Sequence, residues 1–430
     1  MKKNFVIKTL GCKTNQIESA IIEEKLTLAG FNCVSKIEDA QYFILNSCSV
    51  TSHADNKALS TLKTIKKQNP NIITVLTGCF AQLEHKNLKN NPNIDILVGN
   101  QEKTDIVEII QDNQTEVMSD IFSHTEFRYE RLNTLKKTRA TIKIQDGCNN
   151  RCTYCTIPFA RGQNRSNSVN NIVEQINLLK EHGFEEVVLT GIHIGQWGDD
   201  FSPKMSLINL LQEIEKTDIT RYRLGSLNPL ELTDELIDFL SKSEKFCPHF
   251  HLSLQSACDK TLLNMNRHYS FELASDIIQK INEKFIRPFI GSDVIVGFPG
   301  ETDEDFEVTY SNLKEAKTSQ IHVFPYSIRK NTIAASMPNQ VKDSLKKERV
   351  SKLLALSNKK LDEFLQENIG HQAQVIIEPS PDKKTGLKKG MTPNYINVLI
   401  ENADGFNQGE IVNVKLIELS NESRYIKGKV

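Results

Sequence analysis

The chain has 430 residues, of which 39% are apolar and 25% are charged, and its formal net charge is −1. This composition is typical of a globular protein, and the length is too great for one ordinary core, so we expect about two or three domains. The near-zero charge excludes an overall positive charge as the basis of nucleic-acid binding, which would have to rest on local patches.

The chain contains neither a run of about 18 apolar residues nor an N-terminal apolar stretch long enough for a signal peptide. We therefore expect a cytoplasmic protein without a membrane-spanning segment. Its nine cysteines are an odd number. In a chain without an export signal, that number favours metal or redox chemistry over a framework of disulfides.

The first third of the chain alternates short apolar runs with helical patterns. The apolar runs lie at 5–10, 42–46, 72–78 and 95–99. The first helical pattern ends at Gly30, a residue type that is common just after a helix. Because strands that alternate with helices form parallel sheets, we predict an α/β domain with a parallel sheet over residues 1–112.

Three cysteines of this domain, Cys12, Cys48 and Cys79, each follow the end of a predicted strand. Loops at the carboxyl ends of parallel strands converge on one crevice, so three thiols can meet there and hold a 4Fe-4S cluster with one iron free. The alternative is that they are small buried residues, which is a common role of cysteine. We assign that structural role to the other three cysteines outside the central loop, Cys33, Cys247 and Cys258.

A charged segment without a clear period follows, from about Gln111 to Thr138. Near its end stand Lys136, Lys137 and Arg139, which can meet a phosphate backbone. We favour the simpler interpretation that this segment is a solvated linker.

The segment QDGCNNRCTYC (145–155) places Cys148, Cys152 and Cys155 in a CxxxCxxC pattern on one short loop. Three thiolates so close together can hold three irons of a 4Fe-4S cluster, and the fourth iron is then open for chemistry. Structural zinc sites usually have four ligands in two pairs, and no fourth ligand lies nearby in the sequence. A zinc or redox loop is the alternative interpretation.

The predicted strand at 140–147 runs directly into this cysteine loop. Further strands, each separated by a helical pattern, are predicted at 187–191, 221–226, 249–255, 290–298 and 321–327. Six such units predict an open (β/α)6 barrel over residues 134–365, with its active site at the carboxyl ends of the strands. A barrel interior suits a reactive intermediate because its walls exclude water.

The end of the chain has a different pattern. After a long helical stretch at 344–370, apolar and polar residues alternate at 373–378, 394–401 and 410–419. This alternation predicts a small antiparallel β-barrel over residues 368–430. We expect four lysines to cluster in one loop of this barrel, where they can contact RNA phosphates or serve solubility alone, and they are Lys383, Lys384, Lys388 and Lys389.

The order of these parts resembles the methylthiotransferases of the radical S-adenosylmethionine (radical SAM) superfamily. The motifs that carry the resemblance are LGCKTNQIES, NSCSVT, TGCFAQ, IQDGCNNRCTYCTIPFARG, LTGIHIGQWG, HFHLSLQS, MNRHY, VIVGFPGET and HVFPYSIRKNTIAASMPNQV. QDGC, TGIHIG and HVFPYS are most similar to the bacterial branch that acts on N6-threonylcarbamoyladenosine in tRNA. Three residues depart from the family pattern, Gly225, Asn228 and Ala257.

The resemblance implies an N-terminal methylthiotransferase domain, a radical SAM core and a TRAM-like RNA-binding domain. It implies a SAM-cleaving 4Fe-4S cluster on Cys148, Cys152 and Cys155, and an auxiliary 4Fe-4S cluster that carries or donates sulfur on Cys12, Cys48 and Cys79. Contacts with S-adenosylmethionine are expected at Tyr154, Gly191, Ser226, Ser253, Gln255 and Arg267.

The implied reaction uses two molecules of SAM. One methylates sulfur at the auxiliary cluster, and the other yields the radical that opens an unactivated C–H bond at carbon 2 of the adenine on the 3′ side of the anticodon. The cofactor carries the hard chemistry, and the target base must leave its stack to reach the site. The implied partners are the tRNA anticodon stem-loop and an electron donor such as a flavodoxin or ferredoxin, whereas a membrane and DNA are not expected.

Several alternatives share part of this pattern. A methylthiotransferase of an isopentenyl-type tRNA adenosine or of a ribosomal protein would carry the same clusters. A radical SAM enzyme whose second cluster relays electrons would turn over without a sulfur source. A non-catalytic Fe-S protein that binds RNA would never form 5′-deoxyadenosine.

Overall fold

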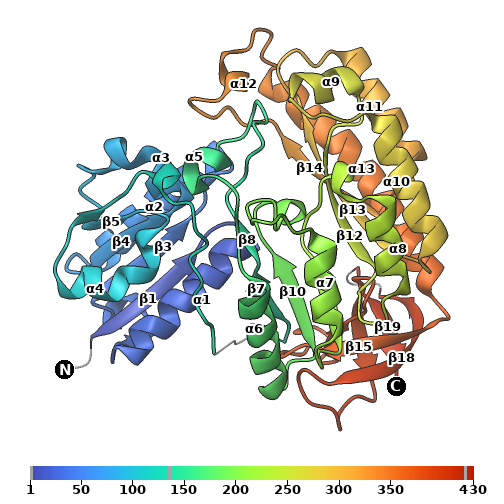
Figure 1. Cartoon of the computed structure of the whole chain (residues 1–430), viewed down its shortest axis with the longest axis horizontal. Coiled ribbons are helices and arrows are strands. Elements are labelled where there is room, and N and C mark those ends of the chain that lie inside the picture. Colours follow the sequence, from blue (N-terminus) through green and yellow to red (C-terminus); the bar gives the residue numbers. More distant parts are fainter. Residues whose placement is uncertain (1–2, 134–137, 421–423) are drawn as a thin grey trace.

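The structure, a computed structural model, describes residues 3–133, 138–420 and 424–430. It has three parts: an N-terminal sheet covered by helices, a central open barrel of strands and helices, and a small C-terminal β-barrel (Figure 1). The predicted α/β fold class with its three kinds of sheet is confirmed.

The N-terminal part is a six-stranded sheet in which every neighbouring pair is parallel. Its strands are β1 (Asn4–Thr9), β2 (Asn32–Cys33), β3 (Tyr42–Ser47), β4 (Ile73–Gly78), β5 (Ile96–Val98) and β6 (Glu116–Val117). Its helices are α1 (Lys13–Leu28), α2 (Ser52–Gln68), α3 (Cys79–Leu88) and α4 (Ile106–Gln111), with 3-10 turns η1 (Ile37–Asp39) and η2 (Glu102–Asp105).

Helices cover both faces of this sheet. Ile22 and Leu26 of α1 join residues of α4 in a core on one face, and Leu62 of α2 joins Phe80 of α3 in a core on the other. All six residues of β3 are buried, which fits the continuous apolar sequence of a parallel strand covered on both faces.

The strand order is β2-β1-β3-β4-β5-β6. The chain therefore moves to one side of β1 to form β2 and then returns to its other side with β3, so the order reverses between β1 and β3. In open parallel sheets, ligands bind at the carboxyl ends of strands beside such a reversal. Cys12 follows β1 and Cys48 follows β3, so these two cysteines flank that point.

The charged segment after α4 is not the solvated linker that its composition suggests. It contributes β6 to the sheet and the 3-10 turn η3 (Ile121–Ser123), buries Leu132, and pairs Glu130 with Lys25 of α1 at 2.8 Å. Arg139, a predicted phosphate contact, instead pairs with Glu378 of the C-terminal barrel at 3.1 Å. Lys136 and Lys137 lie outside the described residues.

The central part contains six parallel strands in two three-stranded sheets, β7-β10-β11 and β12-β13-β14. A parallel bridge between Leu227 and Leu252 links the segment after β11 to β12, so the six strands form one open barrel. The strands are β7 (Ala140–Lys143), β10 (Glu186–Thr190), β11 (Arg221–Leu224), β12 (His249–Gln255), β13 (Phe289–Val296) and β14 (Gln320–Pro325). Two short strands, β8 (Gln145–Asp146) and β9 (Arg165–Ser166), pair beside the cysteine loop.

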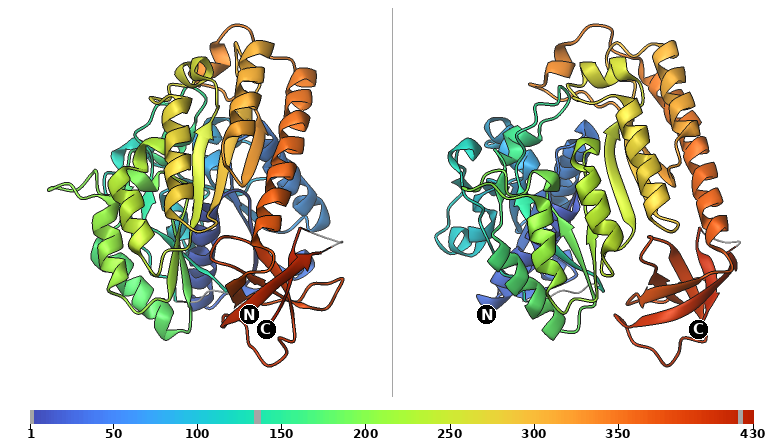
Figure 2. Two further views of the ribbon diagram at one scale, coloured as in Figure 1. Left: turned by 90° about the vertical axis from the view of Figure 1, so that its right-hand side faces the viewer. Right: turned by 45° about the vertical axis from the view of Figure 1, so that its right-hand side comes forward.

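Helices surround this barrel on the outside (Figure 2). They are α6 (Val169–Glu181), α7 (Leu207–Glu215), α8 (Asp234–Lys242), α9 (Asp259–Asn264), α10 (Phe271–Lys284), α11 (Asp303–Glu315) and α13 (Asp343–Asn368). The short helix α5 (Ile157–Arg161) instead lies against α3 of the N-terminal part, and α12 (Ile333–Ser336) belongs to a separate small core beyond β14. The 3-10 turns η4 (Ile194–Gln196) and η5 (Pro229–Glu231) follow β10 and β11. Leu252 and Leu254 of β12 are fully buried in the cores that contain these helices. The intervening His251 and Ser253 therefore face the barrel interior.

The C-terminal part is a closed barrel in the order β15-β16-β17-β19-β18. Its strands are β15 (Gln372–Ile377), β16 (Lys388–Met391), β17 (Asn397–Glu401), β18 (Ile411–Leu419) and β19 (Ile426–Lys429). It is not wholly antiparallel as predicted, because β17 and β19 pair in parallel. Closure leaves the barrel without an open sheet edge.

This small barrel packs against the amino-terminal ends of the central strands, opposite the cysteine loops. Arg223 of β11 donates 2.8 Å to the carbonyl of Pro393, and Arg221 donates 3.2 Å to that of Met391. Both arginines also pair with the buried Glu186 of β10. Among the described residues, no helix combines the length and apolar character that crossing a bilayer requires.

Candidate active site

The cysteines of the N-terminal part gather at the carboxyl ends of β1, β3 and β4. Gly11 has a φ of +106°, and a Cβ there would lie 2.6 Å from Cys48 Cβ and 2.9 Å from its Sγ. The glycine therefore allows the Cys12 loop to approach Cys48. Burial, with the nearby Cys79, raises the pKa of Cys48 to about 11. The three cysteines thus stand at the ends of three neighbouring strands, with the Cys12 loop and Cys79 both close to Cys48.

The remaining cysteines test the structural assignment made from sequence. Cys247 and Cys258 are buried, as predicted. Cys33 is exposed on the edge strand β2, so the prediction of a core role is wrong for this residue. A two-residue strand at the edge of a sheet has a neighbouring strand on one side only, so its side chains stay exposed to solvent.

The cysteine loop of the central part is held at both ends. Strands β8 and β9 pair on either side of it, and the Cys148 amide donates 3.1 Å to the carbonyl of Gly162. The amide of Ile157, at the start of α5, donates 3.4 Å to Cys155 Sγ. Burial raises the pKa of Cys155 to about 12. Thiolate at this position therefore needs a compensating positive charge, which a metal centre supplies.

Both sets of cysteines have the composition that a cubane cluster requires. All six are free thiols. Among the described residues, no group of three or more His, Cys, Asp or Glu side chains is arranged for a single metal ion. A cubane differs from a single ion because each thiolate binds a different iron. The donor set at each position, three thiols from neighbouring loop or strand ends, is of the kind that a 4Fe-4S cluster with one open iron uses.

Arg267 connects the central cysteine loop to β12. Its Nη1 lies 3.6 Å from Cys152 Sγ, and its Nη2 donates 2.7 Å to the carbonyl of Ser253. Its Nε is buried and has no hydrogen-bond partner among the residues that the structure describes. Tyr154 lies beside this group, and burial together with the charge of Cys152 raises the pKa of its phenol well above the ordinary value. Four predicted positions, Cys152, Tyr154, Ser253 and Arg267, are thus brought together.

The other predicted positions lie at strand ends around the same opening. Gly191 follows β10, and a Cβ there would lie 2.8 Å from Gln145 Oε1, which accepts hydrogen bonds from the amides of Ile192 and His193. Close packing against Gln145 is therefore enough to explain a glycine at this position. Ser226 is exposed just after β11, and Gln255 ends β12 with a φ of +69°.

At two of the three departures from the family pattern, the contacts are made by the main chain. The backbone carbonyl of Ala257 accepts 2.7 Å from Asn312, and the backbone amide of Asn228 donates 2.9 Å to Glu231. A Cβ on Gly225 would lie 3.2 Å from the Leu189 carbonyl, so this position favours glycine.

His193 is a neighbour of the cysteine loop that the sequence analysis did not single out. Its Nδ1 lies 3.5 Å from Cys148 Sγ, and its Nε2 pairs with Glu231. Burial alone would lower the pKa of His193, but hydrogen bonds with Cys148 and Glu231 outweigh it and raise the pKa to about 10. The histidine stands inside the motif LTGIHIGQWG, so its position after a barrel strand was the available signal.

A polar group on the inner face of the barrel was also missed. His251 of β12 pairs with Asp293 of β13 at 2.9 Å, and its ring stacks on that of His322 of β14, with centroids 5.2 Å apart. His251 and Asp293 are both about one-quarter exposed, at 23% and 24%. Period-two alternation could have placed all three on one face, but it does not distinguish the inside of a barrel from the outside.

Comparison with known protein families agrees with this division of the chain. Residues 142–313 match the Radical SAM superfamily, and residues 4–99 match Uncharacterized protein family UPF0004. The first match contains Cys148, Cys152 and Cys155, and the second contains Cys12, Cys48 and Cys79. The radical SAM family implies a 4Fe-4S cluster and S-adenosylmethionine.

Solved structures support the fold. The radical S-adenosylmethionine methyltransferase TsrM from Kitasatospora setae matches with a TM-score of 0.57 and 12% identity, over 78% of this chain and 77% of that one. Identity this low supports a common fold alone.

Curated relatives extend over nearly the whole chain. The threonylcarbamoyladenosine tRNA methylthiotransferase MtaB of Bacillus subtilis is 34% identical over 97% of this chain and 95% of its own. The protein of the same name from Aquifex aeolicus is 36% identical over 91% and 95%. The tRNA-2-methylthio-N(6)-dimethylallyladenosine synthase of Clostridium botulinum is 32% identical over 97% and 95%. At 34–36% identity over most of both chains, the chain belongs to the methylthiotransferase family of radical SAM enzymes.

Proposed function

We propose that this protein is a tRNA methylthiotransferase that adds a methylthio group to carbon 2 of the N6-threonylcarbamoyladenosine on the 3′ side of the anticodon. The observation that carries the proposal is the pair of three-cysteine sites in adjoining domains, each at the carboxyl ends of parallel strands. One three-cysteine site is enough for radical formation. Sulfur insertion also needs a source of sulfur, which the second site supplies in this proposal.

In this proposal Cys148, Cys152 and Cys155 hold the SAM-cleaving cluster, and Cys12, Cys48 and Cys79 hold an auxiliary 4Fe-4S cluster. When bound, the clusters and two molecules of SAM supply the radical and the methylated sulfur. Residues 134–365 form the catalytic core, residues 1–112 form the sulfur-donating domain, and residues 368–430 form the RNA-binding domain. A flavodoxin or ferredoxin is the proposed electron donor.

The protein's own side chains orient SAM and protect the site. Arg267 places a fixed positive charge beside Cys152, where it can meet an anionic group of SAM such as the carboxylate. Tyr154 packs against Phe298 and Tyr326 and closes one side of the loop to water. Ser226, Ser253 and Gln255 offer polar groups at neighbouring strand ends, and Gly191 is proposed to lie beside the SAM amino group.

The inner face of the barrel favours threonylcarbamoyladenosine over the dimethylallyl substrate. The threonylcarbamoyl group carries a carboxylate, a hydroxyl and amide groups, all of which need hydrogen-bond partners. His251, Asp293 and His322 offer such partners on the inner face. An apolar dimethylallyl group would cover these polar atoms without satisfying them, which is costly. The relatives named for threonylcarbamoyladenosine are also slightly more similar, at 34–36% identity against 32–33%.

The test is an in vitro assay with the reconstituted enzyme and four substrates: tRNA with the threonylcarbamoyl group, the same tRNA without it, tRNA with the isopentenyl group, and ribosomal protein. Mass spectrometry of the digested products should find the methylthio group on the first substrate alone. A methylthio group only on isopentenyladenosine or on protein would move the enzyme to another branch. Formation of 5′-deoxyadenosine with no methylthio product on any substrate would contradict the proposed reaction.

A further inference from the structure

The N-terminal part contacts the central part through buried polar side chains that lie next to its cysteines. Within the described part of the chain, one such contact lies near each of Cys12, Cys48 and Cys79. They were not expected from the sequence, because the partners are far apart along the chain. Their position suggests a role beyond holding two domains together.

The first contact joins the Cys12 loop to α5, the helix that follows the SAM-cleaving cysteines. Arg161, which is 1% exposed, reaches Glu18 Oε1 at 2.9 Å and Asn15 Oδ1 at 2.6 Å. Asn15 and Glu18 lie in the first two turns of α1, which begins directly after Cys12. Arg161 also donates 3.0 Å to Asp146, just before Cys148. One guanidinium therefore touches segments that adjoin both cysteine sets.

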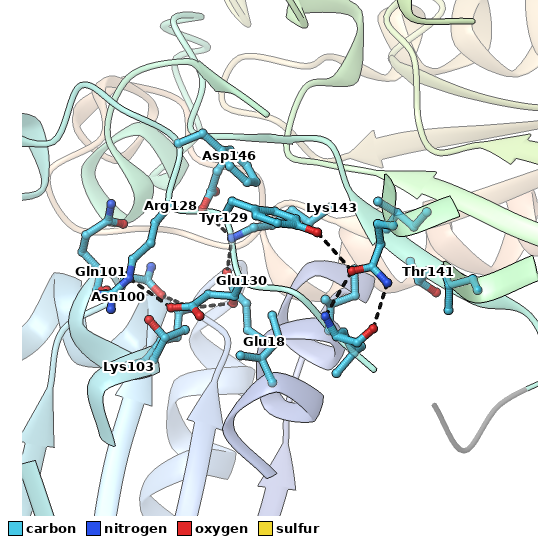
Figure 3. A pocket seen from close by; sticks show the side chains of 18 residues that line it. Glu18, Asn100, Gln101, Lys103, Arg128, Tyr129, Glu130, Thr141, Lys143 and Asp146 are labelled. Atoms are coloured by element: carbon cyan, nitrogen blue, oxygen red, sulfur yellow. Dashed lines mark hydrogen bonds and ion pairs between the residues drawn. The ribbon is translucent and has the colours of Figure 1, made fainter. Parts of the chain in front are cut away.

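Two lysines complete the charge around Glu18. Lys103 of the N-terminal part and Lys143 of the barrel both pair with its carboxylate (Figure 3). Burial alone would raise the pKa of Glu18, but Arg161, Lys103 and Lys143 outweigh it and hold the pKa well below the ordinary value. The carboxylate is therefore a permanent anion between two domains that both supply its cations.

The second contact joins the Cys48 loop to the segment after β14. Arg329, which is 6% exposed, donates 2.6 Å to Ser49 Oγ and pairs with Asp55 at 2.7 Å. Ser49 is the residue directly after Cys48. Nearby, the amide of Ser52 donates 3.1 Å to Ser327 Oγ. The Cys48 loop is thus bound to the central part by a second arginine from a different strand end.

The third contact reaches Cys79 itself. Asn100 Nδ2 lies 3.7 Å from Cys79 Sγ and donates 2.6 Å to the carbonyl of Ala160, the residue before Arg161. Lys103 donates 2.6 Å to the Asn100 side-chain oxygen. This contact therefore connects to the Glu18 group and orients the amide between the thiol and α5.

A buried ion pair contributes little net stability compared with well-packed apolar residues, but it fixes geometry because its partners must meet. Ion pairs beside the cysteines can therefore fix the distance between the two cysteine sites. Building on the function proposed above, we propose that Arg161 and Arg329, the interdomain arginines, are positioning residues that set the distance and orientation of the auxiliary site relative to the SAM-cleaving site. They act through Glu18, Asn15, Ser49 and Asp55 and do not touch substrate.

The test uses Arg329→Ala and Arg161→Ala in the full-length protein with both clusters reconstituted. The first measurement is the magnetic interaction between the two reduced clusters by electron paramagnetic resonance, without RNA. The second is hydrogen exchange of residues 49–55 and 157–161 in the protein without clusters. We expect a weaker or broader magnetic interaction and faster exchange, because the loops lose their partner in the other domain.

The chemical consequence is uncoupling. Formation of 5′-deoxyadenosine should persist, while methylthio product per deoxyadenosine falls on the order of 100-fold, since a misplacement of about 1 Å can have that effect. Arg329→Lys keeps a cation beside Asp55 and should recover part of the loss. If Arg161→Ala does not fold, because Arg161 also supports the cysteine loop, the two Arg329 variants still decide.

Arg139→Ala is the matched control, because it removes another interdomain arginine–carboxylate pair, the one with Glu378, at the opposite end of the barrel. It should leave the magnetic interaction unchanged. An unchanged interaction and exchange in Arg329→Ala would overturn the positioning role, as would an equal loss of deoxyadenosine and product. Absence of methylthio product with the unsubstituted enzyme would instead refute the proposed function, and the RNA-free measurements would still test the positioning role.

Discussion

Arg267 Nη1 lies 3.6 Å from Cys152 Sγ while Nη2 of the same guanidinium donates 2.7 Å to the Ser253 carbonyl. The two contacts use the fixed fork of the guanidinium to tie the cysteine loop to the end of β12. A lysine has one ammonium and cannot reproduce both directions.

We therefore predict that Arg267→Lys slows 5′-deoxyadenosine formation by about 10–100-fold, the range seen when groups supporting a metal site are changed. The iron content should stay the same, because no cluster ligand is lost. The control is Tyr269→Phe, since the Tyr269 ring lies under the Arg267 guanidinium and the phenylalanine keeps that ring. A rate for Arg267→Lys equal to that of the control would mean that the charge alone suffices.

Cys152→Ala should abolish SAM cleavage and leave the N-terminal cluster in place. The two sets of cysteines come from different domains, so loss of one ligand set does not remove the other. Iron analysis should find about four irons per protein, the content of one 4Fe-4S cluster, with no deoxyadenosine. Undiminished deoxyadenosine formation would show that this loop does not hold the SAM-cleaving cluster.

Cys48→Ala should affect the other cluster and leave SAM cleavage intact. The variant should retain the central cluster and cleave SAM, but it should form no methylthioadenosine in tRNA. If Cys48 were only a packing residue, the cost would be about 1 kcal/mol and product would still form. The measurement is the ratio of methylthio nucleoside to deoxyadenosine in one reaction. A folding defect would lower both, so a selective loss of product identifies a sulfur-donating role.

The lysines of the C-terminal barrel are not equivalent, and the prediction of one shared loop is wrong for Lys388 and Lys389, which lie in the strand β16. Lys383, Lys384 and Lys389 line one surface hollow, whereas Lys388 donates to the carbonyl of Phe406 within the barrel. Replacing the first three by alanine should lower the slope of log affinity for tRNA against log salt by up to about 0.9 per lost phosphate contact. Lys388→Ala is the control and should leave the slope almost unchanged. An identical slope in the triple variant would assign these lysines to solubility.

Glu186→Gln should destabilise the central part by about 3–5 kcal/mol, because it leaves Arg221 and Arg223 without their buried counter-charge. Trp197, the one tryptophan of the sequence, is buried in the core of this part. Its fluorescence during denaturant unfolding reports the loss. A change in the free energy of unfolding no larger than that of a surface substitution would contradict the stabilising role of Glu186.

The same group predicts a dependence on pH. Burial alone would raise the pKa of Glu186, but Arg223 and Arg221 outweigh it and lower the pKa below its ordinary value of 4.5. A lowered folded-state pKa stabilises the fold above the unfolded value, and that stability is lost as pH falls below about 4.5. Glu186→Gln should therefore show a smaller loss of Trp197-monitored stability in that acidic range than the unsubstituted protein.

Most strands and the cysteine positions follow from local patterns. The predicted strand 249–255 coincides with β12, and 42–46 differs from β3 by one residue, because long apolar runs have few alternatives. The missed strands β2, β6 and β9 have two residues each, and so short a segment has no period to detect. Strands β16 and β19 were also missed, because their four residues are mostly lysine and glycine and show no apolar alternation. Lys388 was expected to behave like the neighbouring lysines, because the sequence does not show which lysine donates a hydrogen bond to a backbone carbonyl.

The contacts between domains could not be predicted in the same way. Arg329 and Ser49 are separated by 280 positions, and Arg161 and Asn15 by 146. Each arginine stands in a segment with several charged or polar neighbours, and its partner depends on how two separately folded sheets are docked. Local propensity contains no information about that docking. The polar character of the residues only limits which side chains can be partners of each arginine.

The docking of the small barrel at the amino-terminal ends of the central strands has a consequence for the size of the substrate. β13 has eight residues, so at roughly 3.3 Å per residue the strands separate the two ends of the core by about 26 Å. An RNA that touches the hollow around Lys383 and also delivers a base to the cysteine loops must extend along the outside of the core over at least that length. A mononucleoside or a very short oligonucleotide can occupy one of these places at a time. For the proposed function, the distance between the two ends of the molecule therefore calls for a large folded RNA.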